Sequence, residues 1–510
     1  MAGDEDSVML LAYKFLVSGD SLDLIPGPYL ARWSSLYRPY LYLYGNGPQR
    51  LRNLHEKYGP IVRIGPAHVS ISDLTATKQL YGVGNRYRKS EFYDVFSPLY
   101  TGKKFETLFS TQDSVLHRRL RLAIAPRFST MGVSRFEPGI DRAIAMFMKK
   151  MRDLKHDAIS VPQWIEYFSF DLTAETMLGE SLGFMETACD IKGIIGGLQP
   201  GFFYGATVGQ LPWLHPWLLG SQRFLDLLRT LGLPNPTSEI INTVLTKVSS
   251  WRSSGKKDDG SLLAWLQAGE RKQDINLTDD EIVGHIFNLY WFPNSPHHPE
   301  LLSLQIYRLA GSGTKANTLI VVLYHLVKHH DVHRKLVEEI DEYYRANTDS
   351  EQCASGDVRH LPYLQVVIKE SLRMVSAVDI ILERIVPPGG STMLGFHLPQ
   401  GTNIGATANV MHHHPDVFED PARFWPERWM KETTSSEKLQ RMERAFFAFG
   451  RGSRGCIGKP LAMLSMSKFL VTLLRQFDIV WASDAPDWEI KHYFMLRTKG
   501  FLVRFKERLH

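Results

Sequence analysis

The chain has 510 residues, and its 44% of hydrophobic and 11% of aromatic residues are sufficient for an extensive buried core. Its 59 basic and 54 acidic residues leave a net charge of +5, too small and too dispersed to indicate a nucleic-acid partner. The three cysteines, Cys189, Cys353 and Cys456, are so widely spaced that they support neither a disulfide framework nor a Cys-x-x-Cys metal site.

No linker, repeat or break in composition divides the chain, so we predict one large domain over residues 25–510, after a tail of residues 1–24. The tail contains an apolar run from Val8 to Val17 that Lys14 interrupts. A membrane-spanning helix needs about 20 residues, and the acidic residues before the run do not suit a signal peptide. Three interpretations stay open: a soluble chain, a truncated membrane anchor, and a run that only contacts a membrane surface.

The first regular structure predicted along the chain is a β-hairpin, because apolar residues alternate from Ile61 to Ile64 and from Val69 to Ile71. Most of the chain that follows is predicted to be helical. Short β structure is expected again near residues 392–396 and 404–408, which lie between proline- and glycine-rich turns. The fold class is therefore mainly α with small β-sheets (α+β).

A basic segment from His117 to Arg121 is expected to be helical, which places these two residues four apart on one face. Arginine binds carboxylates through paired hydrogen bonds. The segment therefore predicts contact with an anionic group, with a basic face in solvent as the alternative.

A proline cluster breaks a predicted helix in the second half of the chain. Thr278 and Glu281 form a capping box that predicts a helix start. Pro293, Pro296 and Pro299 then follow within seven residues, and each interior proline costs a helix about 3 kcal/mol. We interpret residues 290–308 as an insertion and hypothesise an unremoved intron in the gene.

An acidic and a basic residue, Glu370 and Arg373, are spaced to pair on one face of a predicted helix, and Arg428 supplies a second arginine downstream. Taken alone, such a pair is a surface ion pair worth about 0.2–0.5 kcal/mol.

Cys456 lies in a glycine-rich loop, residues 449–458, that leads into an apolar helical stretch. Glycines allow the backbone to fold tightly around a sulfur and to direct N–H groups at it. The following helix would bring its positive end close and favour the thiolate. This loop is suited to a thiolate bound to a metal, with a buried inert cysteine as the alternative.

The loop resembles the haem-binding signature of the cytochrome P-450 superfamily, Phe-x-x-Gly-x-Arg-x-Cys-x-Gly. Every fixed position matches, from Phe449 through Gly452, Arg454 and Cys456 to Gly458. The resemblance implies the cytochrome P-450 fold, with haem b (iron protoporphyrin IX) held between a long distal helix and the proximal loop that carries the cysteine ligand. It also implies that Cys456 binds the iron as a thiolate, which favours O–O cleavage.

The resemblance implies roles for the other segments as well. Glu370, Arg373 and Arg428 would form a structural ion-pair network near the thiolate side of the haem. Thr314 would be the catalytic hydroxyl of the distal helix, and Phe449 would cover one side of the cofactor. The implied partners of the two haem propionates are His117, Arg121, Arg384 and Arg454.

The distal segment Ala310 to Thr314 departs from the pattern of the family, which usually has Ala/Gly-Gly-x-Asp/Glu-Thr-Thr. Gly313 stands where an acid normally relays protons, and Lys315 stands where a second hydroxyl is common. Proton delivery would then depend on water and Thr314. Alternatively, Thr314 only bonds a carbonyl one turn back in its helix.

The implied function is a haem-thiolate monooxygenase that takes electrons from NADPH through NADPH–cytochrome P-450 reductase. The substrate would be an apolar small molecule, and the whole pattern resembles the fungal secondary-metabolism branch most. Residues 91–108, 201–204, 211–217 and 377–382 would line the pocket, with core packing of their aromatic residues as the alternative. The alternatives are a P-450-like isomerase or dehydratase, motivated by Gly313, and an inactive haem-binding or gene-model-damaged protein.

Localisation depends on the native start of the chain. With an anchor, we expect the protein at the cytoplasmic face of the endoplasmic reticulum membrane. Without an anchor, we expect it to be cytoplasmic or in peripheral membrane contact.

The run His412 to His414 predicts surface or turn histidines, because consecutive residues do not converge on one metal ion.

Overall fold

The computed structural model describes residues 21–97, 99–100, 103–104, 106–154, 156–193, 195–196, 198–231, 260–267, 285, 310–347 and 356–508. The α-helices are α2 (Tyr29–Trp33), α3 (Tyr37–Tyr42), α4 (Gly47–Tyr58), α5 (Leu74–Tyr81), α6 (Ser114–Ile124), α7 (Glu137–Asp153), α8 (Val161–Leu178), α9 (Phe184–Thr187), α10 (Leu198–Thr207), α11 (Gln222–Thr230), α13 (Leu262–Gln267), α15 (Gly313–Lys328), α16 (His330–Ala346), α17 (Pro362–Met374), α18 (Ala408–His412), α19 (Ser436–Ala445) and α20 (Lys459–Gln476). The 3-10 helices used below are η1 (Ser21–Leu24), η2 (Glu91–Phe96), η5 (Val208–Gln210), η6 (Pro212–Trp217) and η8 (Pro426–Trp429).

The strands form five small sheets within the described residues. The largest sheet has the order β1-β2-β10-β7-β3, and the others are β11-β14-β6, β12-β13, β4-β5 and β8-β9. Their bounds are β1 (Ile61–Gly65), β2 (His68–Ile71), β3 (Arg88–Lys89), β4 (Leu99–Tyr100), β5 (Lys103–Lys104), β6 (Ile159–Ser160), β7 (Arg384–Ile385), β8 (Ser391–Met393), β9 (Phe396–Leu398), β10 (Asn403–Gly405), β11 (Phe477–Trp481), β12 (Glu489–His492), β13 (Leu496–Lys499) and β14 (Leu502–Glu507).

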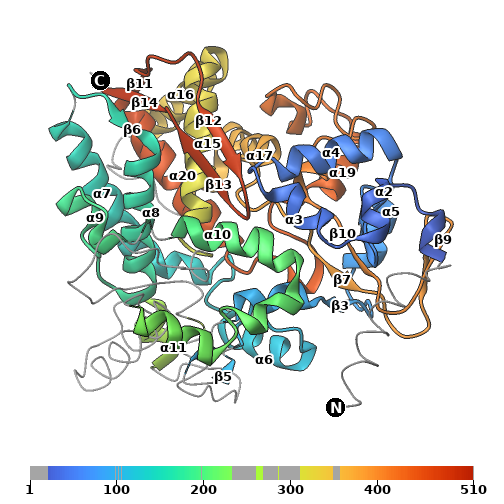
Figure 1. Ribbon diagram of the computed structural model, residues 1–510. Helices are drawn as coiled ribbons and strands as arrows, with labels where there is room; N and C mark the ends of the chain where they lie inside the picture. The colour runs from blue at the N-terminus through green and yellow to red at the C-terminus, as the bar shows by residue number, and fades with distance from the viewer. Residues whose placement is uncertain are drawn as a thin grey trace.

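Long helices form the body of the molecule, with α15 and α20 in its middle, between α7 and α8 on one side and the N-terminal helices on the other (Figure 1). Almost all residues of helix α8 are buried, the polar side chains of Asp171 and Glu175 included. Phe168 of α8 packs on Phe469 of α20 with ring centroids 4.4 Å apart, and Phe147 of α7 lies 5.0 Å from the same ring. This aromatic contact joins α7 and α8 to α20, the helix that follows Cys456.

The predicted hairpin is confirmed: β1 and β2 are antiparallel, and Ile61 lies opposite Ile71. The predicted β structure of the second half is confirmed only in part. The hairpin β8-β9 covers residues 391–398, but β10 ends at Gly405, and Ala408 already begins α18. Thr407 caps that helix through a side-chain bond from the Val410 N–H, which ends the strand early.

Several expectations fall outside the described residues, among them the capping box at Thr278 and the suspected insertion, residues 290–308. Most of the predicted tail, residues 1–20, is outside as well. Its last residues form η1, in which Leu22 is buried against the large sheet. Within the described residues, none of the helices has both the length and the apolar character that a membrane span requires.

Candidate active site

The loop before α20 is folded tightly, as its glycines predict. Gly450 and Gly452 have φ angles of 64° and 65°, which L side chains rarely adopt. A Cβ atom on Gly452 would lie 1.9 Å from the carbonyl oxygen of Tyr81, so only glycine fits there. The Cys456 N–H donates to the Phe449 carbonyl over 2.8 Å and closes the loop. This backbone geometry holds the cysteine at the start of α20.

The Cys456 thiol lies where the helix N-terminus meets a cation. Burial raises the pKa of the thiol, while the N–H groups of Gly458 and Lys459 and the charge of Arg121 act in the opposite direction. The predicted approach of the helix N-terminus and its N–H groups to the sulfur is thus confirmed. Cys456 is also exposed to solvent.

The four basic residues expected to bind propionates do lie close together. Burial, together with the nearby charges of Arg454, Lys89, Arg121 and Arg384, lowers the pKa of His117 to about 3. His117 and Arg121 belong to α6, which is helical as predicted, and His117 is buried in it. The alternative of a solvated basic face is thus excluded for His117.

The cations of this cluster donate to carbonyl or hydroxyl oxygens. Arg121 donates to Gly455 O over 2.9 Å, and Arg454 to Thr111 O over 3.0 Å. Arg384 on β7 donates to the carbonyl of Glu383 over 2.8 Å and to the Tyr93 hydroxyl over 3.4 Å. Burial, together with the charge of Arg384, lowers the pKa of Arg454 to about 10. Arg384 is buried and the other two arginines are partly buried, and positive charges in such surroundings favour an anionic ligand.

Lys89 on β3 also belongs to this cation cluster, and the sequence did not indicate it. Its side chain is buried, donates to the Phe109 carbonyl and lies 3.9 Å from the centre of the Tyr93 ring. Burial and the charges of Arg384 and Arg454 hold its pKa well below the ordinary value. Among the described residues, none of the cations Lys89, Arg121, Arg384 and Arg454 forms an ion pair with a carboxylate.

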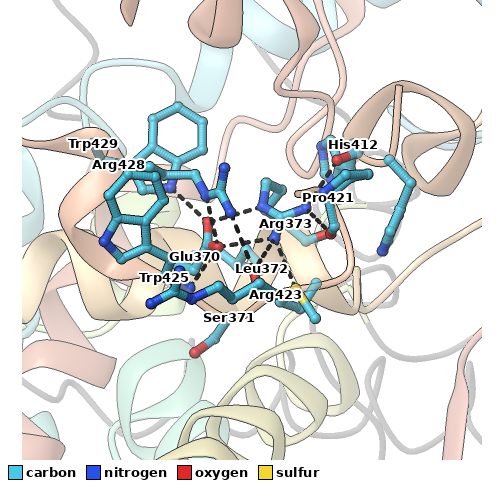
Figure 2. Close-up of polar contacts among 12 residues, drawn as sticks. Glu370, Ser371, Leu372, Arg373, His412, Pro421, Arg423, Trp425, Arg428 and Trp429 are labelled. Carbon is cyan, nitrogen blue, oxygen red and sulfur yellow. Dashed lines mark hydrogen bonds and ion pairs between the residues drawn. The ribbon is translucent and has the colours of Figure 1, made fainter. Parts of the chain in front are cut away.

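The expected ion-pair network is present and fully buried (Figure 2). Both Glu370 and Arg373 on α17 have side chains with 0% exposure, which excludes a surface pair. Arg373 donates to both carboxylate oxygens of Glu370 over 2.8 Å, and Arg428 of η8 donates over 3.0 Å. The Trp429 indole and the Trp425 N–H complete the set of donors at 2.8 Å and 3.0 Å.

Thr314 lies in the first turn of α15. Its hydroxyl donates to the Ala310 carbonyl over 2.8 Å, which is the alternative that the sequence left open. The hydroxyl keeps its acceptor lone pairs in this geometry. The next residue, Lys315, is buried, and burial lowers the pKa of its ammonium group to about 7.

The histidine run was predicted to lie at the surface or in a turn, and this is wrong for His412, which is fully buried at the end of α18. His413 lies in the turn that follows the helix, although it is only 9% exposed. Within the residues that the structure describes, no group of histidine, cysteine and acidic side chains could hold a metal ion.

Aromatic rings from two of the expected pocket walls meet. Phe96 of η2 and Phe202 of α10 lie 4.8 Å and 6.3 Å from the ring of Phe494, in the turn between β12 and β13. Phe109 packs edge-on against Phe96 at 5.3 Å. Phe494 was not predicted to take part in this wall.

Comparison with known proteins agrees with this geometry. The family model "Cytochrome P450" matches residues 29–291 and 302–505. The chain belongs to the cytochrome P450 family. The interruption of the match, residues 292–301, falls within the segment 290–308, whose interpretation as an insertion stays a prediction.

Among curated relatives of this P450, a cytochrome P450 monooxygenase of Aspergillus terreus is 31% identical over 487 residues, 92% of this chain and 93% of the relative. A pisatin demethylase of Fusarium vanettenii is 30% identical and covers 96% of this chain and 91% of its own. Among solved structures, the heme domain of cytochrome P450DA is similar in fold, with a TM-score of 0.72 over 95% of this chain and 98% of that one at 16% identity. The expected fold class is thereby confirmed.

Membership in the family makes the chain an oxidoreductase that incorporates oxygen, with haem b as its cofactor. The residues present fit that group. Haem b carries two anionic propionates and would take a thiolate ligand, which matches an exposed thiol beside cations that lack a carboxylate partner among the described residues.

Proposed function

We propose that the chain is a haem-thiolate monooxygenase in which Cys456 is the axial ligand and an apolar small molecule is the substrate. The observation that carries this proposal is the position of the thiol, which opens to solvent at the start of α20 beside a cluster of buried cations. When bound, haem supplies the activation of O2, and a thiolate ligand favours cleavage of the O–O bond. The N–H groups of Gly458 and Lys459 stabilise the negative sulfur.

In this proposal, the buried cations hold the two haem propionates. Lys89, Arg384 and Arg454 offer charges that have no carboxylate partner in the described residues, and Arg121 lies between them and the loop of Cys456. His117 stays neutral because burial and these charges lower its pKa to about 3. A neutral imidazole can donate one hydrogen bond to a carboxylate without adding to the repulsion among the cations.

Thr314 is the residue that we propose to handle protons on the distal side. Its hydroxyl is oriented by donation to Ala310 O, so its lone pairs can accept a hydrogen bond from water. Gly313 provides no acid beside it, which leaves water and Thr314 to deliver protons. This departure supports a second candidate function, an isomerase or dehydratase that needs no external electrons.

The proposed substrate is a secondary metabolite with a large apolar surface. Phe96, Phe202 and Phe494 form a wall of rings that suits such a molecule. The fungal monooxygenases and the pisatin demethylase among the relatives support a role of the same kind.

We propose NADPH–cytochrome P450 reductase as the electron donor. Arg118 and Arg119 are exposed on α6, whose Arg121 contacts the loop of Cys456. Lys459 is exposed directly after that loop. A basic surface next to the ligand loop suits an acidic redox partner.

We also propose peripheral contact with the endoplasmic reticulum membrane. Tyr29 and Leu30 on α2 are 72% and 68% exposed, and Trp213 and Trp217 on η6 are 63% and 75% exposed. Helix α3, which follows α2, contacts η5, which precedes η6, because Arg38 of α3 donates to Gln210 O of η5 over 2.6 Å. Exposed aromatic residues in such a patch favour a lipid interface. Flotation with vesicles of neutral and anionic phospholipid should carry the protein upward, and Trp213→Ser with Trp217→Ser should abolish this.

The test of the main proposal is a carbon monoxide difference spectrum, recorded after reduction by dithionite and again by NADPH with reductase. Both reductions should give the band of a thiolate-ligated haem, and Cys456→Ser should give none. A band with dithionite alone would favour the isomerase or dehydratase, and absence of haem uptake would reject both enzymes.

A further inference from the structure

His412 is a buried side chain that the proposed chemistry does not use. It is the last residue of α18, with 0% exposure, and its ring stacks on Phe446 at 5.2 Å. It lies between the C-terminal end of α17, which carries Arg373, and the chain that enters the loop of Cys456.

The hydrogen bonds of the His412 ring define its tautomer. The Phe447 N–H donates to Nε2 over 2.8 Å, so Nε2 carries no proton. Nδ1 therefore carries the proton, and it lies 3.1 Å from the Arg373 carbonyl and 3.2 Å from the Ser376 hydroxyl. Burial and the charges of His413 and Arg373 hold the pKa of His412 well below its ordinary value, which keeps the ring neutral.

These bonds continue on both sides of His412. On one side, the Arg373 guanidinium donates to the His412 carbonyl over 3.0 Å while it holds Glu370 (Figure 2). On the other side, the Phe447 carbonyl accepts from Gly450, and the Phe449 carbonyl accepts from Cys456, each over 2.8 Å. These hydrogen bonds, together with the peptide bond between Phe449 and Gly450, connect the buried ion-pair network to the cysteine loop through the His412 ring.

We propose that His412 is a positioning residue that transmits the geometry of the Glu370–Arg373–Arg428 network to the loop carrying Cys456. The proposal rests on the assignment of Cys456 as the haem ligand. Among the described residues, the Nε2 atom of His412 is the only acceptor of the buried Phe447 N–H, and loss of that acceptor leaves the donor unsatisfied. The loop then loses its fixed starting point, and the thiolate separates from the haem more readily.

Two amide substitutions of His412 test its acceptor atom Nε2 and its donor atom Nδ1 separately. His412→Gln places an amide oxygen near the position of Nε2 and can still accept from Phe447. His412→Asn reaches only the position of Nδ1, so it keeps the donor to Arg373 O and loses the acceptor. The control is His413→Asn, because His413 is nearly as buried and, within the part of the chain that the structure describes, its ring bonds Asn409 O at 3.0 Å and makes no bond to the cysteine loop.

The measurement is the half-life of the thiolate-type carbon monoxide band at a fixed mild temperature, normalised to total haem. We expect His412→Asn to shorten it about tenfold relative to the wild type, the change expected for one unsatisfied buried hydrogen-bond donor. His412→Gln and His413→Asn should stay within about threefold of the wild type. Equal half-lives for the Gln and Asn variants would overturn the proposal.

A second measurement needs no bound haem. Hydrogen exchange of the Phe447 amide should accelerate in His412→Asn but not in His412→Gln, and equal exchange in both would also overturn the proposal. A wild-type protein without the thiolate-type band would instead reject Cys456 as ligand, and this proposal with it. A wild-type band with no difference among the variants rejects the role of His412 alone.

Discussion

Replacing Glu370 by alanine should unfold or severely destabilise the protein. The carboxylate accepts five hydrogen bonds, from Arg373 through Nε and Nη2 and from Arg428, Trp425 and Trp429. Its removal leaves two buried guanidinium groups without their shared anion, and breaking one buried pair costs about 3–5 kcal/mol. Because a whole domain is stable by about 5–15 kcal/mol, this loss is a large fraction of the total.

The matched control for this variant is Glu338→Ala. Glu338 pairs with Arg334 one turn away on α16, but the two side chains are 62% and 72% exposed. A pair of this kind contributes about 0–1 kcal/mol. Soluble yield, haem-to-protein ratio and urea midpoint should fall sharply for Glu370→Ala and stay near the wild type for Glu338→Ala.

The role of burial would be refuted by similar urea midpoints in the two variants. Glu370→Gln adds a finer test, since its amide keeps the size of the side chain but removes the charge. We expect it to lie between the wild type and Glu370→Ala. A Gln variant as stable as the wild type would show that hydrogen bonding, not charge, holds the network.

Three further predictions concern the cysteine loop and the distal helix. Gly452→Ala should prevent haem incorporation, because a Cβ atom there would lie 1.9 Å from Tyr81 O; a haem-to-protein ratio equal to that of the wild type would contradict this. Lys315→Met should stabilise the fold most at pH 7 and below, since burial lowers the pKa of the folded-state ammonium to about 7 while the unfolded chain stays protonated up to the ordinary value of 10.5. Wild-type stability should then rise by about 1.4 kcal/mol per pH unit between these values and that of the variant should not, and parallel urea curves across the range would refute the effect. Gly313→Asp should increase product formed per NADPH consumed, because it returns an acid beside Thr314; unchanged coupling in a haem-loaded variant would show that water and Thr314 already suffice.

The parts of the site that the sequence could predict are those in which chemistry depends on residues close together in the chain. The cysteine loop is one, since its glycines, its cysteine and the following helix start lie within ten residues. The pairing of Glu370 and Arg373 is another, because one helical turn separates them. Their complete burial was not visible from spacing; the resemblance to a known family implied a structural network, and the structure shows that both side chains are fully buried.

The parts that could not be predicted are those in which distant segments meet. Lys89 lies on a strand of two residues with an exposed neighbour, and it joins the cation cluster only because β3 pairs with β7, which carries Arg384. Phe494 likewise meets Phe96 and Phe202 only through the turn between β12 and β13. No spacing or periodicity in the sequence relates these positions.

His412 belongs both to a local sequence pattern and to a contact between distant segments. A run of three histidines suggests polar surface, because burying an imidazole costs free energy unless its nitrogens are bonded. The fold meets that condition with the Phe447 N–H on one nitrogen and the Arg373 carbonyl on the other. Since these partners lie 35 and 39 residues away in the chain, local pattern could not reveal them. A buried histidine whose two nitrogens connect separate elements is therefore better explained by the elements that it joins than by the run in which it occurs.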